Sequence, residues 1–214
     1  MLFVGIDLSG PSNTKDTALA ISNLSPDGLE LVFQASNFDD LQLLDKISNF
    51  VKGNSAFVFI DAPLSYNQGG GLRDSDKKFR DLAVSLSLPS TTIMPPTFTK
   101  MGFLTLRGIF VSNLLKENLG FSIHIAETHP GISLALEGIE PALIKNMKSS
   151  VEACNTIAEK LSKLFNKFTL INSHYSDHDI CSIAASLSAK RYFDKKSALI
   201  YEAKPPAHPY NFIC

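Results

Sequence analysis

The chain has 214 residues, of which 44% are hydrophobic and 19% are charged, and this composition predicts one well-packed domain over residues 1–214. Its net charge of −1 excludes a global positive field for nucleic acid, and no run approaches the roughly 20 apolar residues of a membrane span. Three cysteines without metal-type spacing fit a reducing compartment better than a disulfide scaffold and predict no zinc site, so we expect a cytoplasmic protein that does not act at a membrane.

The first predicted element is a buried strand at residues 2–7, which is apolar until it ends on Asp7. A continuous apolar run is typical of a central strand that is covered on both faces. Gly5 weakens such a strand and indicates the close approach of another backbone. Turn-forming residues follow, and two more strands are predicted at residues 17–22 and 29–36. The chain therefore opens with a three-stranded meander.

A helix is predicted next, and it carries the chain back across the sheet. Ser36 and Asp39 have the spacing of a capping box, which predicts that the helix begins there. Leu44, Ile47 and Val51 recur at helical spacing and are expected to form its apolar face.

The strand predicted at residues 56–61 repeats the pattern of an apolar run that stops on an acid, here Asp61. A strand that is reached through a helical crossover is expected to lie parallel to its neighbour in the sheet. If that neighbour is the strand at residues 2–7, Asp7 and Asp61 lie side by side at the same edge.

A third strand of this kind is predicted near residues 121–127, where alternating isoleucines lead to Glu127. A long irregular region precedes it. The glycines at 69–71 predict a flexible hinge in that region, and the prolines that follow prevent one long helix. Two shorter helices are expected at about residues 74–85 and 100–116.

The last third of the chain is predicted to form a helix at residues 149–165, a short strand at 168–172 and a packed helix over 176–193. Ser176 and Asp179 have the spacing of a second capping box at the start of the final helix. An acid in the first turn also interacts favourably with the helix dipole. Asp179 therefore has a structural interpretation as well as a functional one.

Strand-end carboxylates that meet at one edge of a sheet repel one another unless a cation lies between them. All-oxygen coordination favours Mg²⁺ or Mn²⁺. Two such ions about 3.5 to 4 Å apart can hold the attacking water and the leaving oxygen of a phosphodiester. The carboxyl ends of strands are also where open α/β sheets bind ligands. The pattern therefore favours a metal-dependent nuclease, while each acid taken alone also fits a turn or a helix cap.

Four further side chains are candidates for substrate binding or proton transfer. His129 and His178 have the chemistry to act as general acids or bases or to orient a phosphate, although a loop histidine more often does neither. Arg73 and Arg80 can bind phosphate with two hydrogen bonds each, and they fit surface ion pairs as well. The glycines before Arg73 favour the functional interpretation of that residue.

In this order, the motifs resemble the ribonuclease H-like fold, the scaffold of Holliday-junction resolvases. More narrowly, the chain is similar to a family of predicted nucleases catalogued as domain of unknown function four hundred and twenty-nine. The resemblance covers nearly the whole chain. The residues that carry it are Gly5 and Asp7 on the first strand, Ile60, Asp61 and Pro63 at the end of the returning strand, Arg73, Asp76 and Arg80, then Glu127 and Pro130, and finally His178 and Asp179.

The resemblance implies an α/β fold in which a mixed five-stranded sheet of order 3-2-1-4-5 is flanked by helices. It also implies hydrolysis of nucleic acid with Mg²⁺ or Mn²⁺. The expected site residues are Asp7, Asp61, Glu127 and Asp179 as catalytic groups, Asp7, Asp61, Asp179 and Asp177 as metal ligands, and Arg73, Arg80, His129 and Ser9 as substrate-binding groups.

The last motif departs from the family pattern at one position. The pattern has a second aspartate three residues after the first, and this sequence has Ser182 there. Asp179, or Asp177 just before it, is then the candidate for the fourth ligand. With only three acids, the site would have weak activity or none.

Two alternatives of other classes fit part of the sequence. Actin-like ATPases and sugar kinases also open on a Gly-x-Asp strand followed by a phosphate-contacting loop, which here would include Ser9, but they pair two such domains and this chain has one copy. A non-catalytic module that binds nucleic acid or a nucleotide is allowed by Ser182 and by the near-neutral charge. It would bind through a local lysine face, for which Lys160, Lys163 and Lys167 are candidates.

Overall fold

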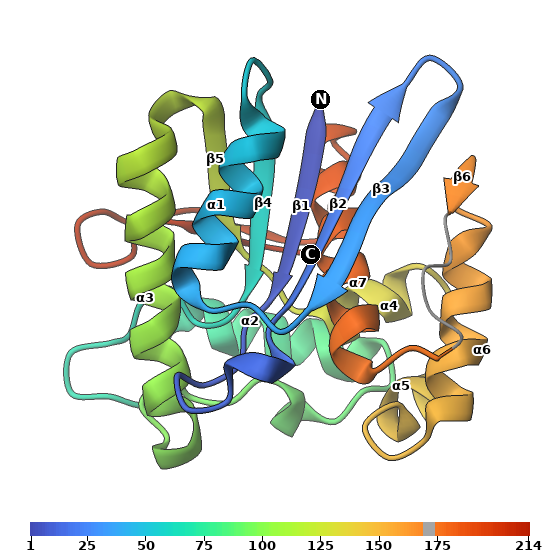
Figure 1. The fold of residues 1–214 in the computed structure, drawn as a ribbon. Helices are drawn as coiled ribbons and strands as arrows, with labels where there is room; N and C mark the ends of the chain where they lie inside the picture. Colours follow the sequence, from blue (N-terminus) through green and yellow to red (C-terminus); the bar gives the residue numbers. More distant parts are fainter. Residues whose placement is uncertain (169–173) are drawn as a thin grey trace.

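A computed structural model describes residues 1–168 and 174–214, and these residues form an eight-stranded mixed sheet with helices on both faces (Figure 1). The strands are β1 (Leu2–Asp7), β2 (Ala18–Ser25), β3 (Gly28–Ser36), β4 (Ala56–Asp61), β5 (Ile123–Glu127), β6 (Lys167–Phe168), β7 (Ile200–Tyr201) and β8 (Asn211–Ile213). The α-helices are α1 (Asp40–Val51), α2 (Asp74–Ser85), α3 (Thr99–Leu119), α4 (Pro130–Leu136), α5 (Pro141–Asn146), α6 (Val151–Ser162) and α7 (Asp177–Phe193). Short 3-10 helices lie at Thr14–Asp16, Ser90–Thr92 and Gly120–Ser122.

The predicted strand order 3-2-1-4-5 is confirmed as the centre of the sheet, whose full order is β6-β3-β2-β1-β4-β5-β8-β7. β1, β2 and β3 form the antiparallel meander, and β4 and β5 follow β1 in parallel. The five predicted strands form this centre, and β6 at one edge and β8 and β7 at the other extend the sheet to eight strands. These added strands have two or three residues each, which is too short for a periodic pattern.

The strand predicted at residues 168–172 is only partly testable. Phe168 lies in β6, which pairs in parallel with β3, and the rest of that prediction lies outside the described residues. Helices α4 and α5 were not predicted, and they follow β5 in a region whose prolines begin both helices. In the part of the chain that the structure describes, no helix combines the length and the apolar character needed to cross a bilayer.

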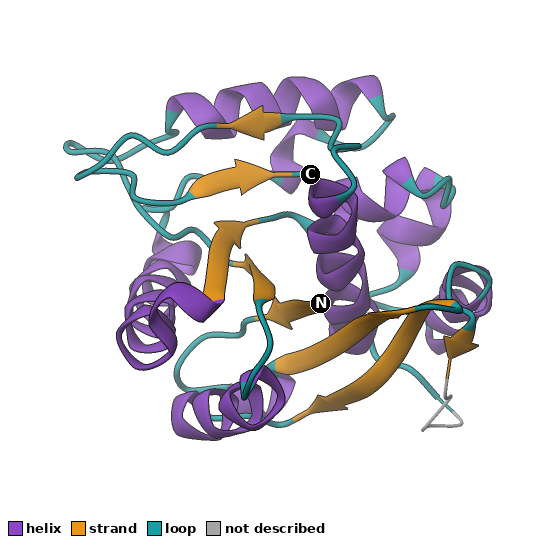
Figure 2. Cartoon of the chain, turned by 90° about the horizontal axis from the view of Figure 1, so that it is seen from above, coloured by secondary structure: helices purple, strands orange, loops and turns teal. Residues whose placement is uncertain are grey.

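The sheet lies between two helical layers, as the view from above shows (Figure 2). Helices α1 and α3 cover one face, where Val4 and Ile6 of β1 pack in the same core cluster as Leu43 of α1. The other face packs on α2 and on α4 to α7, and Phe3 of β1 belongs to that second cluster. Because side chains alternate along a strand, Asp7 lies on the same face as Phe3, the face that α7 covers.

Helix α1 begins three residues later than the sequence predicted. Ser36 is the last residue of β3, so it is not available as a cap. Asp39 is the N-cap, and its side chain accepts a hydrogen bond from the N–H of Gln42 over 2.8 Å while Gln42 Oε1 accepts one from the N–H of Asp39 over 2.9 Å. The buried face includes Leu43 in place of the predicted Leu44, together with Ile47 and Val51 as predicted.

Helix α7 packs directly on β1 at Gly5, so the close backbone approach predicted at this glycine is confirmed. A Cβ atom added at Gly5 would lie 2.0 Å from the carbonyl oxygen of Ser182 and 2.3 Å from the backbone nitrogen of Ser186. Ser182 is fully buried, and its hydroxyl donates to the carbonyl of Asp179 over 2.8 Å. Glycine at position 5 is therefore what lets α7 lie close to the centre of the sheet.

We expect Gly5→Ala to lower the free energy of unfolding by at least about 1 to 3 kcal/mol, because the methyl group would overlap backbone atoms that a side-chain rotation cannot move. Urea denaturation measures the change. Gly102→Ala is the matched control, since a Cβ atom there meets nothing within 4 Å and alanine favours the helix by about 0.8 to 1 kcal/mol. Equal effects of the two substitutions would contradict the packing argument.

Candidate functional site

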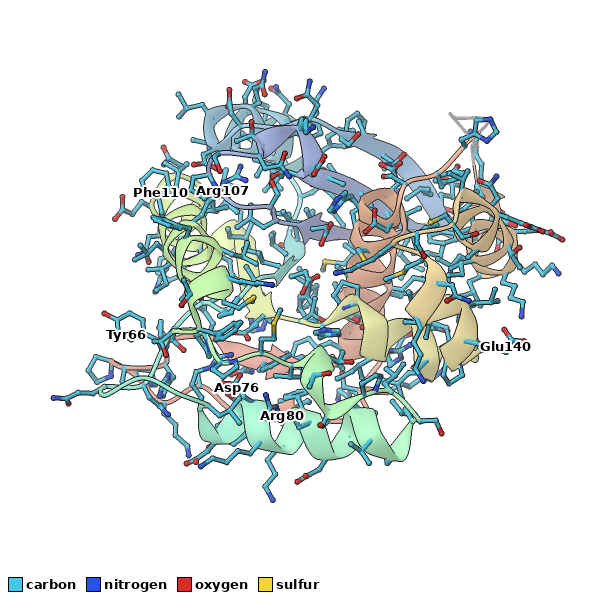
Figure 3. The ribbon with its side chains drawn as sticks, turned by 90° about the horizontal axis from the view of Figure 1, so that it is seen from below. Tyr66, Asp76, Arg80, Arg107, Phe110 and Glu140 are labelled. Atoms are coloured by element: carbon cyan, nitrogen blue, oxygen red, sulfur yellow. The ribbon has the colours of Figure 1, made fainter. Side chains whose placement is uncertain are left out.

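Asp7 and Asp61 are directly opposite each other at the ends of two parallel strands. The register of β1 on β4 pairs Asp7 with Asp61, which confirms the expected neighbourhood of the two acids. Figure 3 looks onto this end of the sheet. Asp7 is only 7% exposed, and Asp61 is half-buried beside it.

Burial and mutual repulsion set the protonation of this pair. Burial raises the pKa of Asp7, against the lowering effect of His178. Burial and then the charge of Asp7 hold the pKa of Asp61 well above its usual range, and Lys148 only partly offsets them. The two carboxylates therefore favour sharing a proton when no cation lies between them.

His178 extends from the first turn of α7 to Asp7. Its Nδ1 donates to Oδ2 of Asp7 over 2.6 Å, while its Nε2 lies 3.7 Å from a carboxylate oxygen of Asp16 and 3.8 Å from one of Asp177. The hydrogen bond to Asp7 is the main reason why the pKa of His178 is raised to about 9. The imidazole is therefore charged at neutral pH, between three acids.

Cys181 lies one turn further along α7 and was not predicted as a site residue. Its Sγ and oxygens of Asp7 and Asp61 all lie within 4.8 Å of one another. Burial, and then the charges of Asp7 and Asp61, raise the pKa of the Cys181 thiol well above its usual value. Ser182, the position at which the family pattern has an acid, packs on β1 instead. Cys181 follows His178 by three residues, about one helical turn, and this spacing is the signal in the sequence that could have identified it.

Asp179 and Asp177 occupy different environments, although both were expected as metal ligands. Asp179 is buried, and its carboxylate accepts hydrogen bonds from the backbone N–H of Ser176 over 3.0 Å and from Nε2 of Gln34 over 2.5 Å. The predicted capping box is confirmed, since Ser176 Oγ accepts from the N–H of Asp179 over 3.1 Å. Asp177 lies at the wall of the hollow beside the strand-end acids.

Glu127, the third strand-end acid, is bound to Arg73 in a buried ion pair. Nη1 and Nη2 of Arg73 donate to the two carboxylate oxygens over 2.8 and 2.5 Å, and the backbone N–H of Leu64 donates to Oε2 over 2.9 Å. Arg73 also pairs with Asp76 on α2, the helix on which Figure 3 labels Asp76. Burial opposes the charge of Arg73, but Glu127 and Asp76 raise its pKa. This network ties α2 to the end of β5.

Two other expected substrate-binding residues are engaged with the chain itself. Nε of Arg80 donates to the carbonyl of Ile93 over 2.9 Å. His129 is the N-cap of α4, where its Nδ1 accepts from the N–H of Ile132 and its Nε2 donates to the carbonyl of Thr92 over 3.2 Å. Burial lowers the pKa of His129 to about 4, so its ring is neutral at the edge of the site.

Ser9 is held in place by Arg107, a buried residue of α3 that the sequence did not single out (Figure 3). Nη1 of Arg107 donates to the carbonyl of Ser9 over 2.8 Å and to Oγ1 of Thr17 over 2.7 Å. Helix α3 also packs on the turn after Asp61, because a Cβ atom at Gly108 would lie 2.7 Å from the carbonyl oxygen of Pro63. Helix α3 thus fixes the loops that follow both strand-end aspartates.

Two adjoining hollows of about 280 and 300 Å³ open over the aspartate pair. Asp7, Asp61, His129, Lys148 and His178 line both of them. Lys148, an exposed residue between α5 and α6, was not predicted to belong to the site. The space therefore has acids at its base and an ammonium group at its rim.

The donor groups of this cluster fit one divalent cation. Asp7 and Asp61 supply carboxylate oxygens within reach of one atom, and burial raises the pKa of both, so a cation between them would favour their charged forms. Glu127 and Asp179, which the expected two-ion arrangement also requires, are bound to Arg73 and to Gln34. The described residues thus offer a cluster for one ion.

We expect Arg73→Met to lower the free energy of unfolding by about 3 to 5 kcal/mol, because it leaves two buried carboxylates without their cation. Lys77→Met is the control on the same helix, since the exposed Lys77–Asp74 pair contributes no more than about 1 kcal/mol. Urea unfolding compares both variants with the wild type. An equally small loss in both would contradict a structural role for the Arg73 network.

The pH dependence of stability tests the contact between His178 and Asp7. The pKa of His178 is raised to about 9 in the folded chain, against roughly 6.5 for an unfolded histidine. Its contribution is therefore fully present below pH ~6.5 and is lost as the pH rises through ~9. In chelator-treated protein, the stability difference between wild type and His178→Gln should shrink over this interval. A difference that does not change with pH contradicts the contact.

Comparison with known proteins gives matches among solved structures alone. No protein-family model matches the chain, so the narrower family resemblance stays an expectation, and no curated protein matches it either. The chain is similar to T. thermophilus RuvC in complex with a Holliday junction substrate, with 9% identity, a TM-score of 0.45, and 92% of this chain and 95% of that chain covered. A second Thermus thermophilus RuvC structure has 11% identity, a TM-score of 0.43, and coverage of 92% and 98%. The chemistry of the site is therefore argued from its own residues.

Proposed function

We propose that the protein is a metal-dependent nuclease, a hydrolase that cleaves phosphodiester bonds at the aspartate pair. The observation that carries the proposal is the register of β1 on β4, which sets Asp7 and Asp61 against each other at the base of a hollow. A buried carboxylate pair without a cation destabilises the chain, and a divalent cation removes that cost. Mg²⁺ or Mn²⁺ suits the carboxylate oxygens.

The cation, when bound, would polarise a phosphate oxygen and lower the pKa of a water molecule. Asp7 and Asp61 are its protein ligands in this proposal. His178 orients the Asp7 carboxylate through its 2.6 Å hydrogen bond, and it carries a proton that a leaving oxygen can accept. Lys148 at the rim of both hollows attracts the phosphate of the substrate.

The size and charge of the hollows favour a polymeric substrate whose backbone lies across their opening. A space of about 300 Å³ accepts a hydrated cation and one phosphodiester group, while the rest of the chain stays outside. Nucleic acid is the proposed substrate class, in keeping with the ribonuclease H-like order of the central strands. The net charge of −1 means that local groups such as Lys148 supply the attraction.

The remaining expected site residues receive positioning roles in this proposal. Glu127 and Arg73 fix α2 and the loop after β4, and Asp179 fixes the first turn of α7, from which His178 reaches Asp7. Ser9 belongs to the loop after β1, which Arg107 holds in place by donating a hydrogen bond to the carbonyl of Ser9. His129 and Arg80 hold the segments that form the far wall of the hollows.

The test is a cleavage assay with Mg²⁺, Mn²⁺ or chelator on labelled single-stranded, duplex and branched DNA and RNA. We expect cleavage that requires the cation and falls by at least about 10²-fold in Asp7→Asn and in Asp61→Asn, since each change removes a charged ligand. Circular dichroism and the melting temperature verify that the variants remain folded. Asp61→Asn relieves the repulsion and should not lower stability in chelator, whereas Asp7→Asn also removes the ion pair with His178 and should lower stability relative to Asp61→Asn.

Asp81→Asn is the matched control, because Asp81 is an exposed acid on α2 outside the cluster and its replacement should leave cleavage unchanged. Absence of cleavage over the whole panel, with folded protein and bound cation, contradicts the nuclease proposal and favours a binding module. ATP hydrolysis that is lost in Asp7→Asn would instead favour the kinase-like alternative.

A further inference from the structure

Cys181 gives the proposed cation site a third donor of a different kind. Its Sγ lies within 4.8 Å of carboxylate oxygens of Asp7 and Asp61. The three groups come from separate elements, β1, β4 and α7, which the packing of α7 on Gly5 holds together. Their convergence therefore depends on the tertiary fold and not on the spacing of neighbours in the sequence.

Among the residues that the structure describes, the thiol of Cys181 has no hydrogen-bond partner. The side chain is only 8% exposed, and it makes no hydrogen bond with any residue in 1–168 or 174–214. The thiol of Cys154, by contrast, donates to the carbonyl of Met147 over 3.1 Å, and that of Cys214 lies against Thr128 and the carbonyl of His129. Cys181 is thus a buried polar group that lies against two carboxylates, and of these only Asp7 has a hydrogen-bonded cationic side chain, His178, among the described residues.

We propose that Cys181 is a ligand of the cation held by Asp7 and Asp61, and that this donor set makes the site prefer a borderline divalent cation such as Zn²⁺ or Co²⁺ over Mg²⁺. The inference rests on the cation site of the proposed function. Thiolate sulfur binds Zn²⁺ and related ions well, while Mg²⁺ demands oxygen ligands and keeps its water. The proposed site therefore differs from an all-oxygen cation site in one ligand, the sulfur of Cys181.

Binding changes the thiol chemically. The S–H bond breaks, its proton passes to solvent, and the electron pair left on sulfur forms the bond to the cation. No oxidant or reductant takes part. The position of Cys181 on α7, one turn from His178, leaves the imidazole on Asp7 undisturbed, so the carboxylates and the thiolate can bind the same ion together.

Titration of the metal-free full-length chain with Co²⁺, followed by absorption, tests this inference without reference to activity. A thiolate ligand produces a sulfur-to-cobalt charge-transfer band in the near ultraviolet. We expect this band in the wild type and its loss in Cys181→Ser, with Co²⁺ affinity lowered at least about tenfold, the smaller of the effects seen when metal-site partners are removed. Affinity for Mg²⁺ should change little.

Cys154→Ser is the matched control, since Cys154 is buried and its thiol is satisfied outside the cluster, so the band should persist. Cys181→Ala serves as a second variant if the serine form does not fold, and it should lose the band in the same way. Circular dichroism establishes the folded state of each.

The outcomes separate the two proposals. Co²⁺ binding without the band, at equal affinity in wild type and Cys181→Ser, overturns the role of Cys181 and leaves the carboxylate site intact. Absence of Co²⁺ binding, or binding that Asp7→Asn does not weaken, overturns the cation site and the Cys181 inference with it. A band that survives in Cys181→Ser assigns the sulfur ligand to another cysteine and also refutes the inference.

Discussion

The approach of α7 to Gly5 of β1 is the contact on which the arrangement of the site depends. A side chain at position 5 would meet the backbone at Ser182 and Ser186, so any other residue would force the helix away from the sheet. With the helix in place, His178 reaches Asp7 and Cys181 faces both strand-end aspartates. Glycine at position 5 therefore determines whether side chains that are far apart in the sequence meet in one site.

The sequence predicted the central part of this arrangement because the signals were local and strong. Long apolar runs identified β1 and β4, and the crossover between them predicted the parallel pairing that places Asp7 beside Asp61. The capping box at Ser176 and Asp179 located the start of α7. Local sequence patterns sufficed for these elements, because an uninterrupted apolar run predicts a strand buried on both faces and a capping box predicts the start of a helix.

The parts that the sequence did not predict depend on tertiary context. The short strands at the sheet edges carry too few residues for a pattern, and α1 begins at Asp39 because β3 extends through Ser36. The rotation of α7 about its axis is also a property of packing, and it brings Cys181 instead of Ser182 to the aspartates. Arg107 and Lys148 reach the site from segments distant in sequence, which no spacing rule connects to it.

The four acids expected to act together are distinguished by whether the protein already satisfies them. Glu127 accepts hydrogen bonds from Nη1 and Nη2 of Arg73 and from a backbone N–H. Asp179 accepts hydrogen bonds from the side chain of Gln34 and from the backbone N–H of Ser176. Such carboxylates are stabilised without any ligand, so a cation would have to displace protein groups to bind them. Burial raises the pKa of both Asp7 and Asp61 instead, and the charge of Asp7 raises that of Asp61 further. The proposed cation position is therefore distinguished by acids that the protein itself leaves incompletely stabilised, and not merely by the presence of an acid at a strand end.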